Sequence, residues 1–248
     1  MLCQTLKVRR FSSMLASFNV GIWKIGLFIA ISFLVIFFPN VSPASTSGKP
    51  FSMPFAGPPS YTTWHVSQMY GNTKIAHMQR NTVYDEGQGL HFGIDFSAEC
   101  GEPVLAIGDG TVFSIDGPWG AWPHNVVIYH GNDLYSVYGH LRVRSSHLAI
   151  GQAVVAGDVV GLNGDWQDPE NCTVSPHLHL EIRTDSMRRA VNPVDYIDAN
   201  WDDSTLGISG HLFEIDVSNL GRWQSIYDQP SIRFGGPILN NYYKRWIE

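Results

Sequence analysis

Residues 176–182 read Pro-His-Leu-His-Leu-Glu-Ile, and this stretch decides the fold. Apolar and polar residues alternate along it with a period of two, which is the pattern of a β-strand with one face in a core. Because side chains two positions apart point the same way, His177 and His179 share one face and the apolar residues share the other. The stretch therefore predicts a strand that holds two imidazoles side by side on a rigid backbone.

Other short β-like runs surround this strand and are separated by Gly, Asn, Asp and Pro. The triplets Gly108-Asp109-Gly110 and Gly131-Asn132-Asp133 each separate two such runs, and these residue types tolerate the positive φ of hairpin turns. No segment shows a sustained helical period. We therefore expect an all-β fold, an antiparallel β sandwich or barrel-like domain with a hairpin at each triplet. The other predicted runs are 103–107, 111–115, 125–130, 134–140, 153–155 and 159–162.

The composition suits a folded, acidic protein. A length of 248 residues suits one medium domain with extensions. Hydrophobic residues make up 44% and charged residues 15%, a composition that argues against general disorder. The formal net charge is -6, and residues 1–44 contain basic but no acidic residues, so the remainder is more acidic still. Phosphate binding requires clustered Lys and Arg, so we expect no nucleic-acid partner.

Residues 1–44 are expected to form a signal peptide or a membrane anchor. Basic residues precede the apolar run 25–38, which is shorter than the roughly 20 residues that a membrane-spanning helix needs. Small residues follow at Ser42 and Ala44, as at a signal cleavage site, although nearby prolines leave cleavage open. Both alternatives place the rest of the chain outside the cytoplasm, secreted or in the cell envelope. Any membrane contact would then be through this uncleaved segment.

The rest of the chain is expected to divide into three parts. Residues 45–60 form a linker rich in Pro, Gly and Ser, residues 61–197 form the domain, and residues 198–248 form a C-terminal extension. The extension begins where the composition becomes acidic and aromatic, and we expect it to pack back onto the domain. Cys100 and Cys172 remain as a pair if the N-terminal segment is removed. An oxidising compartment permits a disulfide between them, and two free buried thiols are the alternative.

A second motif can complete a metal site with the histidine pair. His91-Phe-Gly-Ile-Asp95 offers an imidazole and a carboxylate four residues apart. Two imidazole nitrogens and a carboxylate, with one position left open, are a catalytic zinc arrangement. Either motif alone is weak, but their order along the chain and a third element, Tyr138-Gly-His140-Leu141, strengthen the interpretation.

These motifs together resemble the lysostaphin-type peptidases, the M23 family of zinc endopeptidases. That family has HxxxD, then a Tyr-x-His-Leu strand, then a Gly-rich approach to HxH, and the resemblance here runs over about residues 71–196. It implies a lysostaphin-type β domain and an enzyme that hydrolyses peptide cross-links or stem peptides of bacterial peptidoglycan.

The resemblance also implies a role for each motif residue. His91, Asp95 and His179 would bind Zn²⁺. His177 would be the general base or would orient the attacking water, and His140 would be its partner near the oxyanion.

Two other protein classes compete with the enzyme. A non-catalytic wall-binding or regulatory protein could keep the fold, but loss of a ligand would be its signature and none is lost. A cupin-type barrel also uses paired histidines in strands. Its ligands would include a Glu soon after the pair and a later His, so an HxxxD motif before the pair does not suit it.

Several residues are secondary candidates. Glu181 and Arg183 continue the face of the histidine pair and could support the metal site or contact the substrate, and the alternative is that they are solvated strand residues. Tyr84 could hydrogen-bond the transition state, but its spacing matches no family tyrosine, and Asn72 is interpreted as a turn residue. The expected groove walls are Trp119, Trp122 and Trp166. The remaining histidines are interpreted as surface or loop residues: His65, His77, His124, His130, His147 and His211.

Overall fold

The computed structural model describes residues 48–207, 214–216 and 219–241. The described residues belong to one of two compact units, Pro43–Glu248. The predicted signal segment, His211 and the end of the C-terminal extension lie outside the described residues. Within the described part of the chain, no helix is long and apolar enough to cross a membrane.

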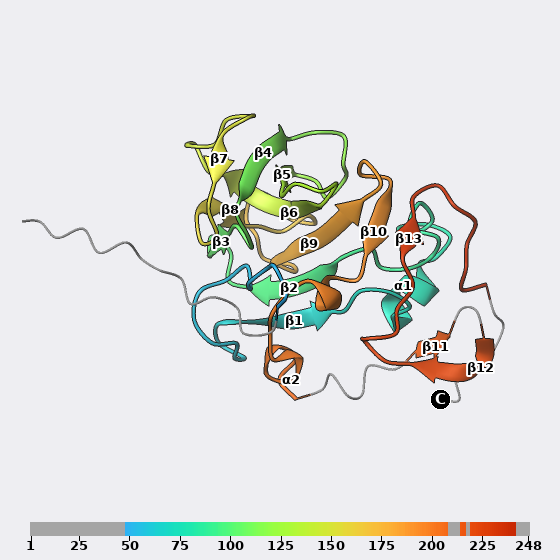
Figure 1. Ribbon diagram of the computed structural model, residues 1–248. Helices are drawn as coiled ribbons and strands as arrows, with labels where there is room; N and C mark the ends of the chain where they lie inside the picture. The colour runs from blue at the N-terminus through green and yellow to red at the C-terminus, as the bar shows by residue number, and fades with distance from the viewer. Residues whose placement is uncertain (1–47, 208–213, 217–218, 242–248) are drawn as a thin grey trace, which may run out of the picture. The chain divides into compact units, whose positions relative to one another are not determined.

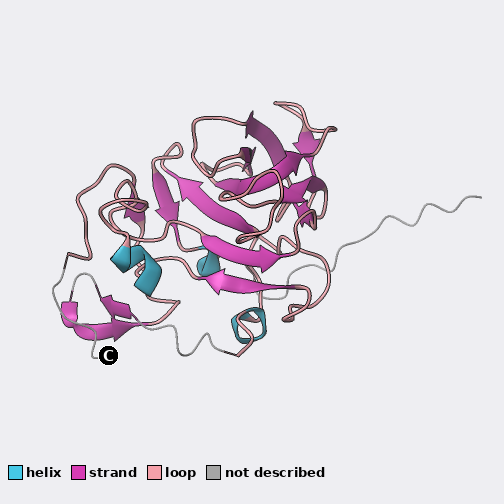
Figure 2. Cartoon of the chain, turned by 180° about the vertical axis from the view of Figure 1, so that it is seen from behind, coloured by secondary structure: helices cyan, strands magenta, loops and turns pink. Residues whose placement is uncertain are grey.

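The described chain is mostly antiparallel β-sheet with a few short helices, which confirms the all-β prediction (Figures 1 and 2). The main path of the larger sheet runs in the order β1 (Trp64–Gln68), β2 (Ile94–Ala98), β9 (His177–Thr184), β6 (Tyr135–Arg144), β5 (His124–Tyr129), β4 (Gly110–Ile115) and β7 (Ala153–Val154). There are two branches off this path. On one, β10 (Arg189–Val191) pairs with β9, and β13 (Ile232–Arg233) pairs with β10. On the other, β8 (Val159–Asn163) pairs with β6, and β3 (Pro103–Leu105) pairs with β8. The remaining elements are the pair β11 (Glu214–Asp216) and β12 (Asn219–Gln224), and the helices α1 (Lys74–Met78), η1 (Pro193–Asp195) and α2 (Trp201–Ser204).

Strand β9 lies inside the sheet, between β2 and β6, and shows the predicted alternation. The side chains of Leu178, Leu180 and Ile182 are fully buried in the main hydrophobic core. His177 and His179 are on the opposite face. Since both neighbours of β9 are paired antiparallel to it, the histidine-bearing face is fixed on both sides.

The two predicted hairpins have different outcomes. Residues 131–133 connect β5 to β6 as an antiparallel hairpin, and Asn132 and Asp133 both adopt positive φ. The hairpin predicted at residues 108–110 is wrong, because β3 pairs with β8 while β4 pairs with β5 and β7. None of residues 108–110 adopts positive φ. These turn-forming residues therefore carry the chain between strands that do not pair with each other.

Tyr138, the tyrosine of the Tyr-x-His motif, is a core residue. Its hydroxyl is fully buried, accepts a hydrogen bond from the backbone N–H of Ile107 at 2.8 Å and lies 3.1 Å from the Ser136 hydroxyl. Burial raises the pKa of Tyr138 to about 12. The residue therefore ties β6 to the segment after β3, two positions before His140 in the same strand.

Segments on both sides of the predicted domain pack onto it. Phe51 and Phe55, in the predicted linker, are buried in the core, and Phe51 forms an isolated bridge with Ile197. In the C-terminal extension β13 pairs with β10, so this segment packs back onto the sheet as expected. The predicted boundaries at residues 60 and 197 stay predictions.

Replacing Tyr138 by Phe is expected to lower the free energy of unfolding by about 1–3 kcal/mol, because the buried Ile107 N–H loses its acceptor. Urea unfolding measures this change. Tyr129→Phe on the same sheet is the control, because that side chain is 36% exposed and its change should stay within about 0.5 kcal/mol. Equal effects of the two changes would contradict this role of the buried hydroxyl.

Candidate metal centre

The pairing of β2 with β9 brings the two metal-site motifs together. In this register Asp95 is directly opposite His179, and Ser97 is opposite His177. On the other side of β9, Gly139 of β6 is opposite His179, which brings the neighbouring His140 to the same place. Three motifs that are far apart in the sequence therefore meet on adjacent strands.

His91 enters the site from the segment just before β2. Its backbone forms an isolated antiparallel bridge with Gly71, through hydrogen bonds of 2.7 and 2.8 Å. Its ring Nδ1 lies 2.8 Å from the carbonyl oxygen of Met69, an acceptor that holds the proton on Nδ1. The lone pair of Nε2 is therefore free to face Asp95 and His179.

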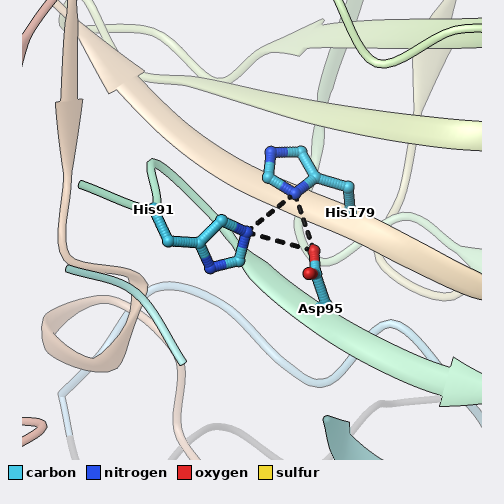
Figure 3. A group of neighbouring side chains, drawn as sticks. All are labelled: His91, Asp95 and His179. Carbon is cyan, nitrogen blue, oxygen red and sulfur yellow. Dashed lines mark hydrogen bonds and ion pairs between the residues drawn. The ribbon is translucent and has the colours of Figure 1, made fainter. Parts of the chain in front are cut away.

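Figure 3 shows that three donor atoms converge. Asp95 Oδ1 lies 2.7 Å from His179 Nδ1 and 3.2 Å from His91 Nε2. The two ring nitrogens are 3.2 Å apart, and the donor atoms of the group all lie within 4.8 Å of one another. Two imidazole nitrogens and one carboxylate oxygen match the ligand preference of Zn²⁺ in open, catalytic sites. The residues present therefore fit a metal ion, as the sequence predicts.

His140 and His177 lie beside this cluster with similar geometry. His140 Nδ1 is 2.6 Å from the carbonyl oxygen of Trp122, and His177 Nδ1 is 2.7 Å from that of Ser175. The centroids of the two rings are 4.9 Å apart. Each ring therefore carries its proton on Nδ1 when neutral, and Nε2 is the atom left for chemistry.

His140 also has an unusual backbone. Its φ is 57°, in the left-handed region that residues with a Cβ adopt at a cost of order 1 kcal/mol. The conformation is held by the hydrogen bond from its backbone N–H to the carbonyl oxygen of Ala121, at 2.9 Å. His140 thus lies beside the histidines of β9, with ring centroids 4.9 Å from His177 and 5.7 Å from His179.

The electrostatics of the cluster centre on buried charges. Burial alone would raise the pKa of Asp95, but the His91 ring in its protonated form and the hydrogen bond from His179 hold it well below its usual value. Burial alone would lower the pKa of His179, but the hydrogen bond to Asp95 and the nearby Glu181 raise it to about 9. Burial, together with the charges of His179 and His177, lowers the pKa of His140 to about 3. Near neutral pH His140 is therefore neutral, and a bound cation would lower its pKa further.

The carboxylate of Glu181 lies close to Nε2 of His179, on the side of the ring away from Asp95. Glu181 is fully buried and accepts two hydrogen bonds from Arg183, Nε to Oε2 at 2.7 Å and a terminal nitrogen to Oε1 at 2.9 Å. Its Oε1 is 3.6 Å from His179 Nε2, too long for a hydrogen bond but close enough for electrostatic attraction. The solvated alternative for Glu181 and Arg183 is therefore wrong, and Glu181 is placed to orient the ring.

The cluster opens into a cavity of about 440 Å³. All five predicted site residues line it, and so does Trp166. The expectation for the other two tryptophans is wrong. Trp119 packs against the small cluster of Val127, Val137 and Met187, and the Trp122 side chain is exposed and not part of the wall. Trp122 contacts the site through its carbonyl oxygen, which lies within hydrogen-bond distance of His140 Nδ1.

Two further wall residues are Tyr84 and Gln68. The ring of Tyr84 meets that of His91 edge-on at 5.6 Å, and its hydroxyl is 3.4 Å from Gln68 Oε1. Burial and the charge of Asp95 raise the pKa of Tyr84 to about 12. The sequence does not predict that Gln68 lines the site, because the orientation of its side chain depends on an irregularity in the pairing of β1 with β2. Asn72 does not line the cavity.

The opposite wall is tied by a disulfide. Cys100 and Cys172 are bonded, with their Cα atoms 6.0 Å apart, which settles the pair in favour of a disulfide. Cys172 lies in the loop between β8 and β9, which contributes Trp166, Gln167 and Ser175 to the cavity. The bond therefore joins this wall to the turn after β2.

Residues 89–193 match the model of Peptidase family M23, and the matched span contains all five predicted site residues. These residues form a peptidase M23 domain. An uncharacterized metalloprotease of Haemophilus influenzae is 36% identical to this chain over 104 residues, which are 42% of this chain and 20% of that protein. The DD-carboxypeptidase/endopeptidase Mpg of Neisseria meningitidis is 38% identical over 105 residues, 42% of this chain and 22% of that protein.

The chain thus spans about a fifth of the length of these curated relatives. Among solved structures, a zinc containing peptidase from Vibrio cholerae is similar at 24% identity and a TM-score of 0.43, over 58% of this chain and 39% of that one. The assignment to family M23 rests on the sequence match.

The affinity of the M23 cluster for zinc is expected to rise with pH. A metal ion must displace the proton of His179, whose pKa is about 9, so the apparent affinity should increase up to about tenfold per pH unit until that value is reached. Competition with a chromophoric chelator between pH 6 and pH 9 measures this. His124→Ala, at a partly exposed site away from the cavity, should follow the same curve, and His179→Ala should abolish tight binding. A pH-independent affinity of the wild type would contradict the predicted proton release.

Proposed function

We propose that this protein is a zinc-dependent endopeptidase that hydrolyses peptide cross-links or stem peptides of bacterial peptidoglycan. The observation that carries the proposal is the placement of three convergent metal-donor atoms and two further histidines on the wall of one cavity. The match to family M23 supports peptidase chemistry, and the Neisseria relative is named a DD-carboxypeptidase/endopeptidase.

His91, Asp95 and His179 would hold the zinc ion. When bound, Zn²⁺ lowers the pKa of water toward about 7 and polarises a carbonyl group. The protein's part is to keep the three ligands in place. The Met69 carbonyl fixes the tautomer of His91, and Glu181 attracts the far side of the His179 ring.

His177 is proposed as the general base. Its Nδ1 proton is engaged by the Ser175 carbonyl, so the lone pair on Nε2 can accept a proton from the attacking water. The same nitrogen then returns the proton to the leaving amine. His177 Nε2 is 4.0 Å from Asp95 Oδ2, so the imidazolium that forms in between has a carboxylate nearby.

His140 is proposed as the partner near the oxyanion. In its neutral form its Nε2 carries a lone pair, because Nδ1 donates to the Trp122 carbonyl. Its low pKa keeps the ring neutral, so Nε2 can accept a hydrogen bond from the attacking water or from a hydroxyl group formed at the scissile carbonyl.

We propose further that the enzyme acts outside the cytoplasm, secreted or in the cell envelope, where peptidoglycan lies. The Cys100–Cys172 disulfide supports this location, because such bonds persist in oxidising compartments. The proposed partners are peptidoglycan peptides, without nucleic acid.

The function is tested by mass spectrometry of fragments released from purified peptidoglycan by the zinc-loaded protein. New peptide termini are expected with the wild type. His177→Ala should release them about 10²–10⁴ times more slowly, since it removes the general base. His147→Ala, at an exposed site, is the matched control and should behave as the wild type. Intact peptidoglycan from a zinc-loaded wild type that still binds it would favour the non-catalytic wall-binding alternative.

Trp166 is expected to act in substrate binding. Its side chain lines the cavity and remains 41% exposed, so it offers an apolar surface to the substrate without touching the metal donors. Trp166→Ala should raise KM more than it lowers kcat, as steady-state kinetics on the identified peptide will measure. An equal loss in kcat and kcat/KM would show a contribution made only in the transition state.

A further inference from the structure

The C-terminal segment 225–241 lies outside the M23 match, yet it contacts the residues on which the metal site depends. Its strand β13 pairs with β10 beside the ligand-bearing strand β9 (Figure 1). Residues before and after β13 contact residues 70–90, the segment that leads into His91. This segment also supplies Ile75, Gln79, Val83 and Tyr84 to the cavity wall.

Asn240 is the central contact. It is fully buried, and its Nδ2 donates to the carbonyl oxygen of Gly89 at 2.6 Å and to Asn72 Oδ1 at 3.1 Å. These two acceptors belong to the two chain segments that the Gly71–His91 bridge joins. One side-chain amide thus connects the residue after Gly71 to a residue two positions before His91.

Two glycines make room for this segment. A Cβ on Gly89 would lie 2.2 Å from Asn240 Oδ1, and a Cβ on Gly71 would lie 2.2 Å from Gln229 Oε1. Both glycines also have positive φ, +79° and +98°. The same Gln229 Oε1 accepts a hydrogen bond from the backbone N–H of Asn72 at 2.8 Å. The bridge that carries His91 is therefore shaped to receive side chains of the C-terminal segment.

Further contacts run along the rest of the segment. Gln88 Oε1 accepts from the backbone N–H of Arg233 at 2.7 Å, and Gln88 Nε2 donates to the carbonyl oxygen of Pro237 at 3.1 Å. The backbone N–H of Leu239 donates to the Gln88 carbonyl at 2.9 Å. These bonds hold Gln88, three positions before His91.

The segment also reaches the other imidazole ligand. Phe234 packs edge-on against Phe92 at 5.4 Å between ring centroids, and Phe92 packs edge-on against His179 at 5.3 Å. The guanidinium of Arg183, the partner of Glu181, lies 4.2 Å above the Phe234 ring. Both histidine ligands therefore have neighbours that the C-terminal segment holds.

We propose that residues 225–241 are a positioning element of the metal centre, with Asn240 as the residue that holds the Gly71–His91 bridge and hence the direction of His91 Nε2. The inference rests on the proposed metal site but not on the identity of the substrate. A metal ligand fixed before binding loses less conformational freedom when the ion arrives. Loosening the bridge should therefore weaken zinc binding although no ligand has changed.

The test is the isosteric change Asn240→Asp, which keeps the shape of the side chain but replaces the donor by a carboxylate facing two oxygens. Asn132→Asp is the matched control, because it makes the same change in charge at an exposed position in the turn between β5 and β6. Zinc affinity is measured by chelator competition on the full chain. Amide hydrogen exchange of residues 70–91 is measured on the metal-free protein.

We expect Asn240→Asp to weaken zinc binding about tenfold, as loss of outer contacts to metal ligands does, and to speed exchange in residues 70–91. Asn132→Asp should change neither quantity. Gln229→Ala, at a partly exposed position, is a second and milder variant that should shift both quantities the same way if Asn240→Asp does not fold. Wild-type zinc affinity and exchange in the folded variants would overturn the proposal. Neither readout involves peptide cleavage, so a failure of the proposed function would be seen separately.

Discussion

The site depends first on the register between β2 and β9, which sets Asp95 opposite His179. In a sheet, a slip of one residue turns every side chain of a strand to the other face. Such a slip would put the leucines of β9 where the histidines lie and would move Asp95 away from its partner. The register is held from the core side, because Leu178, Leu180 and Ile182 are fully buried on the opposite face of the same strand. Packing of the core therefore fixes the geometry of the polar site.

The same pairing creates an electrostatic problem that the surrounding residues solve. Two carboxylates, Asp95 and Glu181, are buried on either side of His179, and unpaired buried charges are costly. Arg183 compensates Glu181, and a proton on His179 compensates Asp95 when no cation is bound. A divalent cation can take over the second role and release that proton. The cluster is thus arranged for a cation at the point where its donor atoms converge.

Much of this could be predicted from the sequence. The alternation around His177 and His179 predicts the strand and its two faces, and the motifs predict which side chains meet. The wrong hairpin at residues 108–110 and the misplaced Trp119 have one cause, since pairing and burial there depend on distant strands. Likewise, burial of Glu181 with Arg183 requires the neighbouring strands, and the contacts of Asn240 join residues 151 and 168 positions apart. Local patterns contain no signal for such contacts.

The central claim is that these three donor atoms form one metal site. Anomalous diffraction from crystals of the zinc-loaded protein tests it most directly. The account predicts a zinc peak about 2.0–2.2 Å from His91 Nε2, Asp95 Oδ1 and His179 Nδ1, with His140 and His177 beside it but not bound. A peak on any other group of side chains, or one ligated by His177 in place of His179, would contradict the account.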